Sequence, residues 1–225
     1  MSRTPKATPW WRRPVVITPV LIVLLCGAMV QQTTFVGPEG FSSEQAGSST
    51  DEAVALARDG YESTVLPAVT EDPVPLVDVV AAAQEDPEAA GEELGTHEVD
   101  GKPYSYAVTA TGTVAEGEFG EVALEVDGLP EGITVGVAVP PYGSSTALRD
   151  VGLEVQYGDF ENQIAYQAVA FELNSLAAED AFDGAEADDL LGKQVTVVGA
   201  ITWASSTGGD VTHLQILPVR IEEQG

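Results

Sequence analysis

Side chains that suit molecular recognition are concentrated between Arg149 and Gln163. An arginine fork, side-chain amides and carboxylates make directed hydrogen bonds, and the aromatic rings among them offer flat apolar faces. Planar polar groups beside the aromatic faces of Tyr157, Phe160 and Tyr166 suit a sugar or another neutral polyol. The candidate binding residues are Arg149, Asp150, Tyr157, Asp159, Phe160, Asn162 and Gln163.

The same residues also have a purely structural interpretation. Arg149 can pair with Asp150 or Asp159 and hold a barrel against its helix. Asn162 and Gln163 fall in the first turn of an expected helix, where side chains commonly cap the backbone. Buried polar networks are commonly structural, so the residues alone favour this interpretation over a binding site.

The sequence lacks the motifs of the main catalytic mechanisms. Ser144 and Ser145 have no nucleophile-elbow pattern around them, and neither His97 nor His213 is marked as a partner base. There is no glycine-rich phosphate loop, and among 36 acidic residues close carboxylate pairs arise by chance. We therefore expect no enzymatic activity and no cofactor.

An acidic stretch over residues 179–189 contains side chains that could supply oxygen ligands to calcium. The residues concerned are Asp180, Asp183, Glu186, Asp188 and Asp189. Their spacing does not match an EF-hand loop, so a solvated acidic connector is the better interpretation. One cysteine and two histidines are too few for most zinc sites, and we predict no metal centre.

Charge is distributed very unevenly along the chain. No acidic residue precedes Glu39, whereas residues 36–225 contain 5 basic and 36 acidic residues. Such a surface repels phosphate backbones, so nucleic acid is not expected as a partner. The acidity is also a simple means of keeping an exposed domain soluble and monomeric.

An apolar run over residues 15–30 follows four basic residues in the first thirteen positions. This order predicts a cytoplasmic N-terminus and an exported remainder. The favoured interpretation is a single-pass signal anchor over residues 15–36. Cleavage after Ala28 would give a secreted form, and lipidation of Cys26 would attach the chain by a lipid instead. All three interpretations place the acidic domain outside the cytoplasm.

The expected organisation has three parts. Residues 1–36 form a cytoplasmic tip and membrane segment, residues 37–50 a flexible tether, and residues 51–225 an extracytoplasmic domain. Within this domain, residues 51–100 are expected to be helical and residues 101–225 rich in strands. Apolar residues at steps of three or four predict helices around 54–69, 75–84 and 87–94, with Ser49 or Thr50 capping the first.

After Gly101 the apolar period changes from about 3.6 to 2, which indicates strands. The expected strands lie at 104–114, 121–127, 133–139, 195–201 and 211–221, with a short extended segment at 151–155. A helix over 161–178, capped by Asp159, separates the third and fourth long strands. This order predicts an α+β fold, namely an OB-like five-stranded β-barrel preceded by a small N-terminal helical region.

Three segments of the chain resemble a bacterial family of predicted periplasmic lipoproteins of unknown function. They are STALRD (145–150), GDFENQIAY (158–166) and GKQVTVVGA (192–200), with weaker similarity at VLPAV (65–69) and KPYSY (102–106). The resemblance places Ala147, Leu148, Arg149, Asp150, Asp159, Phe160, Asn162 and Gln163 in the family signature and gives none a catalytic role. Members usually carry a small residue before a lipid-bearing cysteine, whereas Leu25 precedes Cys26 here.

Members of this family are typically encoded beside sugar ABC-transporter genes. The resemblance therefore implies an exported, membrane-tethered accessory or ligand-binding module that serves carbohydrate uptake. Its partner would be a sugar or the substrate-binding protein of a transporter. The alternative is a structural or assembly protein of the cell envelope without a small ligand.

Overall fold

The computed structural model describes residues 43–118, 120–205 and 209–224. The expected tip and anchor over residues 1–36 lie outside this range, as does the first part of the expected tether. The chain divides into residues 1–45 and 46–225, and the description below concerns the second unit. Within the described residues, no helix has the length and apolar character needed to cross a membrane.

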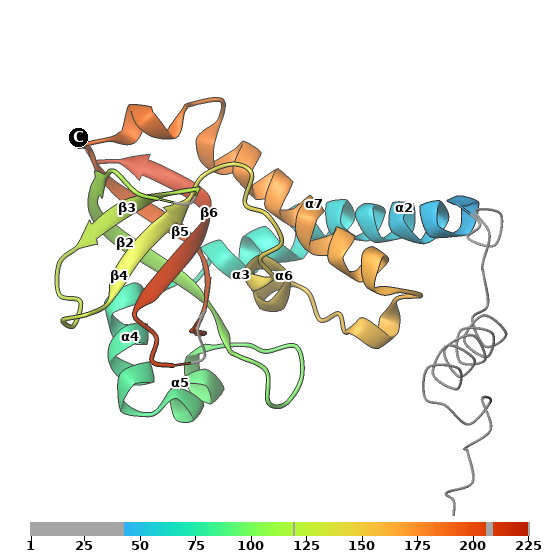
Figure 1. Ribbon diagram of the computed structural model, residues 1–225, viewed down its shortest axis with the longest axis horizontal. Coiled ribbons are helices and arrows are strands. Elements are labelled where there is room, and N and C mark those ends of the chain that lie inside the picture. Colours follow the sequence, from blue (N-terminus) through green and yellow to red (C-terminus); the bar gives the residue numbers. More distant parts are fainter. Residues whose placement is uncertain (1–42, 119, 206–208, 225) are drawn as a thin grey trace, which may run out of the picture. The chain divides into compact units, whose positions relative to one another are not determined.

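Five strands close into a barrel, as the sequence predicts (Figure 1). They are β2 (Ser105–Ala115), β3 (Glu121–Val126), β4 (Thr134–Ala138), β5 (Gln194–Thr202) and β6 (His213–Glu223). Their order around the barrel is β2-β3-β4-β6-β5, and the pairing of β5 with β2 closes it. Only β4 and β6 of these five run parallel. The helix between the third and fourth strands is α7 (Gln163–Phe182).

Alternating side chains fill the barrel interior. In β2, Tyr106, Val108 and Val114 are buried, and in β5 Val195, Val197 and Ile201 are buried, with Ile201 opposite Tyr106. The period of 2 in the sequence is the direct cause, because successive residues of a strand point to opposite faces. This apolar interior fixes the register of the strands, since a one-residue slip would expose the whole set.

The first helical region is longer than the sequence predicts. α2 (Ser43–Gly60) continues through a π-helical turn, η2 (Tyr61–Val65), into α3 (Leu66–Thr70). The prediction of a tether up to residue 50, with a helix start at Ser49 or Thr50, is therefore wrong for 43–50. Pro67 lies in the first turn of α3, where its missing N–H is tolerated, so it does not end the helix.

Two shorter helices follow as predicted. α4 (Leu76–Glu85) and α5 (Pro87–Leu94) agree with the expected spans, and the Asp86 side chain caps α5 by accepting from the N–H groups of Glu88 and Ala89. A two-residue strand before them, β1 (Val74–Pro75), pairs in parallel with β2 and was not predicted. It is too short to give a periodic signal in the sequence.

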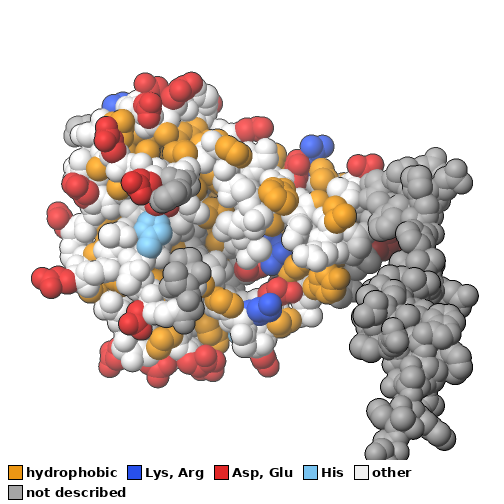
Figure 2. All heavy atoms as spheres, in the orientation of Figure 1, with side chains coloured by type: hydrophobic (Ala, Val, Ile, Leu, Met, Phe, Trp, Pro, Cys, Tyr) orange, Lys and Arg blue, Asp and Glu red, His pale blue; other side chains and the backbone are white. Residues whose placement is uncertain are grey.

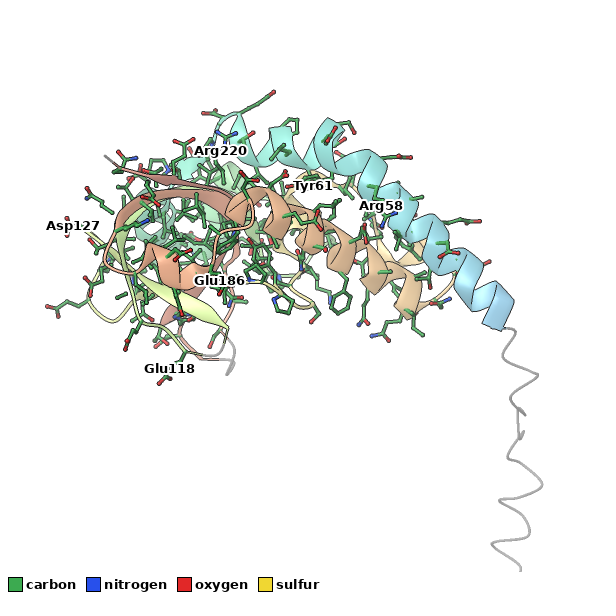
Figure 3. The ribbon with its side chains drawn as sticks, turned by 90° about the horizontal axis from the view of Figure 1, so that it is seen from above. Arg58, Tyr61, Glu118, Asp127, Glu186 and Arg220 are labelled. Atoms are coloured by element: carbon green, nitrogen blue, oxygen red, sulfur yellow. The ribbon has the colours of Figure 1, made fainter. Side chains whose placement is uncertain are left out.

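The helices α2 and α7 run side by side, with Arg58 and Tyr61 between them (Figure 3). Arg58 Nε lies 2.6 Å from Glu172 Oε1, and the Tyr61 hydroxyl donates to Asp180 Oδ2 at 2.9 Å. The prediction of an acidic connector from residue 179 is therefore wrong at its start. Asp180 is part of α7. Its carboxylate is held by the Tyr61 hydroxyl, and the buried residues Ala181 and Phe182 extend the helix beyond it.

The segment between β4 and α7 also differs from the prediction. Residues 151–155 were expected as a short strand or extended segment, and the chain is extended at Leu153. Residues 151 and 152 instead belong to a helix, α6 (Ala147–Gly152), which buries Leu148 and Arg149. The next turn, η3 (Tyr157–Asp159), ends at the residue that the sequence assigned as the cap of α7. Asn162 caps α7 instead, since its Oδ1 accepts from the Ala165 N–H at 2.9 Å.

Gly152 marks a close contact between α6 and the π-helical turn. A methyl group at this position would lie 2.6 Å from Val65 Cα, which is shorter than any relaxed contact. We expect Gly152→Ala to lower the free energy of unfolding by about 1–3 kcal/mol through overpacking. Urea denaturation measures the effect.

Gly158→Ala is the matched control, because no heavy atom lies within 4 Å of the methyl group it would add. It should leave stability within about 0.5 kcal/mol of the wild type. Equal effects of the two substitutions would show that α6 and η2 do not pack as closely as described.

Candidate functional site

The guanidinium of Arg149 lies at the centre of the candidate site. Its side chain is only 3% exposed. Nε and Nη2 donate to Asp150 Oδ1 at 2.9 and 2.7 Å, and Nη2 lies 3.7 Å from Glu98 Oε2. The guanidinium carbon stands 4.0 Å from the centroid of the Tyr166 ring. Two carboxylates and one aromatic face thus surround a single buried cation, the arrangement that such a charge requires.

Three separate segments bring these groups together. Arg149 and Asp150 come from α6, Tyr166 from the first turns of α7, and Glu98 from the loop between α5 and β2. The loop is held on α6, because the Thr96 hydroxyl donates to the backbone oxygen of Asp150 at 2.8 Å. The second carboxylate oxygen of Asp150 accepts from the Thr146 hydroxyl at 2.6 Å. Asp150 is therefore fully engaged and holds the arginine fork in place.

A cavity of about 460 Å³ opens beside this cluster. This volume is in the range of small-molecule sites. The polar residues that line it are Glu98, Lys102, Ser144, Thr146, Arg149, Asp150, Tyr157, Gln163, Tyr166, Gln167 and Thr202. One aromatic wall is open to solvent, since Tyr157 is 54% exposed and meets the Tyr166 ring edge-on, with 5.7 Å between centroids. The cavity thus combines donors, acceptors and an exposed aromatic ring.

The hydroxyl of Tyr166 is buried without a hydrogen-bond partner of good geometry. Burial, and secondarily the neighbouring Glu98 carboxylate, raise the pKa of Tyr166 above its ordinary value. The phenol therefore stays protonated at physiological pH and remains a potential donor at the cavity wall.

Four of the seven predicted site residues line this cavity, namely Arg149, Asp150, Tyr157 and Gln163. Phe160 packs behind them against the Tyr166 ring, with 5.3 Å between centroids. The other two have structural partners. Asp159 accepts from the Gln156 N–H at 2.8 Å, and Asn162 caps α7 while its Nδ2 donates to Ser49 Oγ at 3.3 Å.

Other lining residues were not among the predicted site residues. Tyr166 is an exception in part, because the sequence already indicated it as an aromatic face beside the polar cluster. Lys102 begins the KPYSY segment, so it carries a sequence signal that could have been used. Glu98 and Thr202 lie in a loop and at a strand end, and no pattern in the sequence connects them with Arg149. They join the site only because the chain folds back on itself.

No group of three or more His, Cys, Asp or Glu residues in the described parts of the chain is arranged to hold a metal ion. In the acidic stretch, Asp180 accepts from Tyr61, and Asp189 accepts from the Glu186 N–H at 3.3 Å. These two carboxylates stabilise a helix pair and a turn.

The closed barrel, with a helix between its third and fourth strands and a polar cavity beside that helix, defines an OB-fold protein with accessory helices. More specifically, the chain belongs to the family of predicted periplasmic lipoproteins (DUF2291), whose model matches residues 20–222. It is therefore a membrane-associated, extracytoplasmic protein. A comparison with curated proteins found no match.

A solved structure supports the fold independently. The chain is similar to an OB-fold protein from Thermotoga maritima, with a TM-score of 0.57 and 16% sequence identity. The similarity covers 76% of this chain and 98% of the other. At this identity the likeness shows the fold alone.

The buried pairing of Arg149 predicts a large structural effect on its removal. We expect Arg149→Ala to lower the free energy of unfolding by about 3–5 kcal/mol, because Asp150 and Glu98 lose their buried counter-charge. The double variant Arg149→Ala/Asp150→Ala should lose less stability than the two single variants lose together, by about 0.5–3 kcal/mol. Denaturant titration of the four proteins measures both quantities.

Arg58→Ala provides the matched control, because Arg58 also pairs with a glutamate but is 64% exposed. Its loss should cost less than about 1 kcal/mol. A cost for Arg149→Ala as small as that for Arg58→Ala would contradict the burial of the cluster.

Proposed function

We propose that this protein is a membrane-tethered extracytoplasmic binding module that takes up a neutral polyol, such as a sugar, in the Arg149 cavity. It acts by non-covalent recognition, without catalysis, as an accessory to a carbohydrate ABC transporter. The observation that carries the proposal is the Arg149–Tyr166 stack, compensated by Asp150 and Glu98, at the wall of a small polar cavity.

Charge supports a neutral ligand over an anionic one. Arg149 is already compensated by Asp150 and Glu98. With Lys102, the cavity lining contains two cations and two carboxylates, so its formal charge is balanced and an anion would meet both carboxylates. Carboxylate and amide oxygens accept hydrogen bonds from hydroxyl groups, and the cavity lining offers both kinds. The exposed ring of Tyr157 provides the flat face on which a sugar ring can stack.

Non-covalent binding is supported by the way the polar groups are engaged. The Thr146 hydroxyl donates to Asp150, and the Thr202 hydroxyl is hydrogen-bonded to Ser105 Oγ at 2.8 Å. Asp150 is itself held by two hydrogen bonds from Arg149, and neither hydroxyl is hydrogen-bonded to a histidine in the described part of the chain, so neither is arranged as an activated nucleophile. The excess of acidic residues would repel a phosphate backbone, which argues against nucleic acid as a partner.

The link to carbohydrate transport rests on the family resemblance given above, and a transporter's substrate-binding protein is the second partner that it implies. A structural or assembly role in the envelope is the competing function. The competing role is favoured by the same buried pairing of Arg149, because that pairing would hold the loop, α6 and α7 together without any ligand.

Sugar binding can be tested with a panel of mono- and oligosaccharides by thermal shift and calorimetry. A sugar present at 100 times its dissociation constant should add about 2.7 kcal/mol of stability. Tyr157→Ala and Gln163→Ala should weaken binding by about tenfold or more and leave stability almost unchanged, because both side chains lie at the exposed side of the cavity.

Ile164→Ala is the control, since Ile164 is 65% exposed on α7 and does not line the cavity. It should retain full affinity. If no sugar stabilises the protein while a membrane protein co-purifies with it, the assembly role replaces the binding role.

Attachment to the membrane is the second part of the proposal. We expect residues 15–36 to act as an uncleaved signal anchor, because Leu25 is large for the position before a lipidated cysteine. The intact mass of the purified protein should equal that of the full chain, and Cys26→Ser should leave it in the membrane fraction. A lipid-sized mass increase that Cys26→Ser abolishes would show lipid attachment, and loss of residues 1–28 would show cleavage.

A further inference from the structure

A second groove, independent of the Arg149 cavity, runs between the C-terminal half of α7 and residues 139–143. We propose that it binds an extended peptide segment of a partner protein in which an apolar side chain is flanked by lysine or arginine. The groove has a volume of about 1040 Å³ and shares no lining residue with the Arg149 cavity. Peptide binding in this groove can therefore be tested independently of sugar binding.

The walls of the groove are apolar. Pro140 and Pro141 form one side, and Phe171, Ala178 and Phe182 of α7 form the other. Phe171 is 49% exposed, which is unusual for a phenylalanine without a partner. Figure 2 shows hydrophobic side chains gathered where the end of α7 meets the barrel, with acidic side chains around them. An apolar side chain of an incoming segment would bury this surface.

Asn174 supplies the second observation, because its side chain is 98% buried at the groove and only half satisfied. Its Nδ2 donates to the backbone oxygens of Gly143 and Ser145 at 3.0 and 2.9 Å. Both partners are acceptors, so the amide nitrogen must face them and Oδ1 faces away from them. Oδ1 has no donor in the described structure.

A buried carbonyl oxygen without a donor costs about 1–3 kcal/mol. Because Asn174 Oδ1 is itself closed to solvent, a donor from a ligand gains this energy only when the side chains that cover the oxygen move aside. A peptide backbone carries an N–H at nearly every residue and can supply the donor beside the apolar side chain.

Charge identifies the flanking residues of the occupant. Glu179, Glu186 and Asp188 line the groove, and no lysine, arginine or histidine lines it. Glu186 follows the end of α7 (Figure 3). A cationic side chain next to the apolar one would meet these carboxylates, whereas an acidic segment would be repelled. The excess of acid over the whole domain adds to the same selection.

The test uses the full-length protein in detergent and a library of random twelve-residue peptides displayed on phage. Enriched peptides should carry an aromatic or aliphatic residue beside lysine or arginine, and their affinity should fall as salt is added. Phe171→Ala and the double change Glu186→Lys/Asp188→Lys should each weaken binding of the synthesised peptides by about tenfold or more. On saturation, the NMR signal of the Asn174 side-chain amide should shift.

Two controls separate the groove from the rest of the surface. Ile164→Ala removes an exposed apolar side chain of α7 outside the groove, and Glu125→Lys reverses an exposed charge on β3. Both should retain full peptide affinity. The proposal is overturned if no peptide is enriched, if the enriched peptides are acidic, or if they bind the groove variants as well as the controls. An unchanged Asn174 amide signal would also overturn it. Loss of sugar binding with peptide binding intact would affect only the proposed function.

Discussion

The buried guanidinium of Arg149 is the constraint on which the arrangement of α6, the loop before β2 and the start of α7 depends. A cation in an apolar environment must keep its counter-charges, because desolvation without them costs more than one domain's stability can absorb. Asp150, Glu98 and the Tyr166 ring therefore have to arrive at the same place. This requirement joins α6, the loop before β2 and the start of α7, which have no regular backbone pairing with one another. The cavity beside them is a consequence of that junction.

The barrel provides the frame for the junction. Closure by β2 and β5 leaves no free edge between these five strands, and α7 is the crossover between the third and fourth of them. Because α7 starts at the Arg149 cluster and ends at the apolar groove, one helix positions both candidate sites at opposite ends. The pairing of α2 and η2 with α7, through Arg58 and Tyr61, stiffens this helix from outside. A ligand site at one end and a peptide groove at the other would suit an accessory protein that connects a small molecule with a larger assembly.

The sequence predicted the regular elements well and the irregular ones poorly. The strands of the barrel and the helices α4 and α5 were predicted because apolar residues repeat along them with a clear period. Between Ala147 and Asp159, residues 151–155 were predicted as a short strand or extended segment and Asp159 as a helix cap. The segment forms α6 and a short turn because Gly152 allows close contact with Val65 and because the Arg149 pairing outweighs a weak alternation of apolar residues. Local propensity could not reveal either contact, since the partners lie far away in the chain.

Considered by itself, the sequence determined the OB-like barrel, the α+β class, the acidic surface and the importance of Arg149, because periodicity, charge and residue type are local properties. Only the tertiary structure decided how each polar residue is used. Asn162 caps α7 and Asp159 caps η3, whereas Asp150 and Tyr157 line a cavity. Glu98 and Thr202 reach the same cavity from distant segments of the chain. The tertiary structure also left the Asn174 oxygen without a donor beside exposed Phe171. These outcomes depend on which groups meet in space, and a hydrogen bond or ion pair between remote residues leaves no periodic trace in the chain.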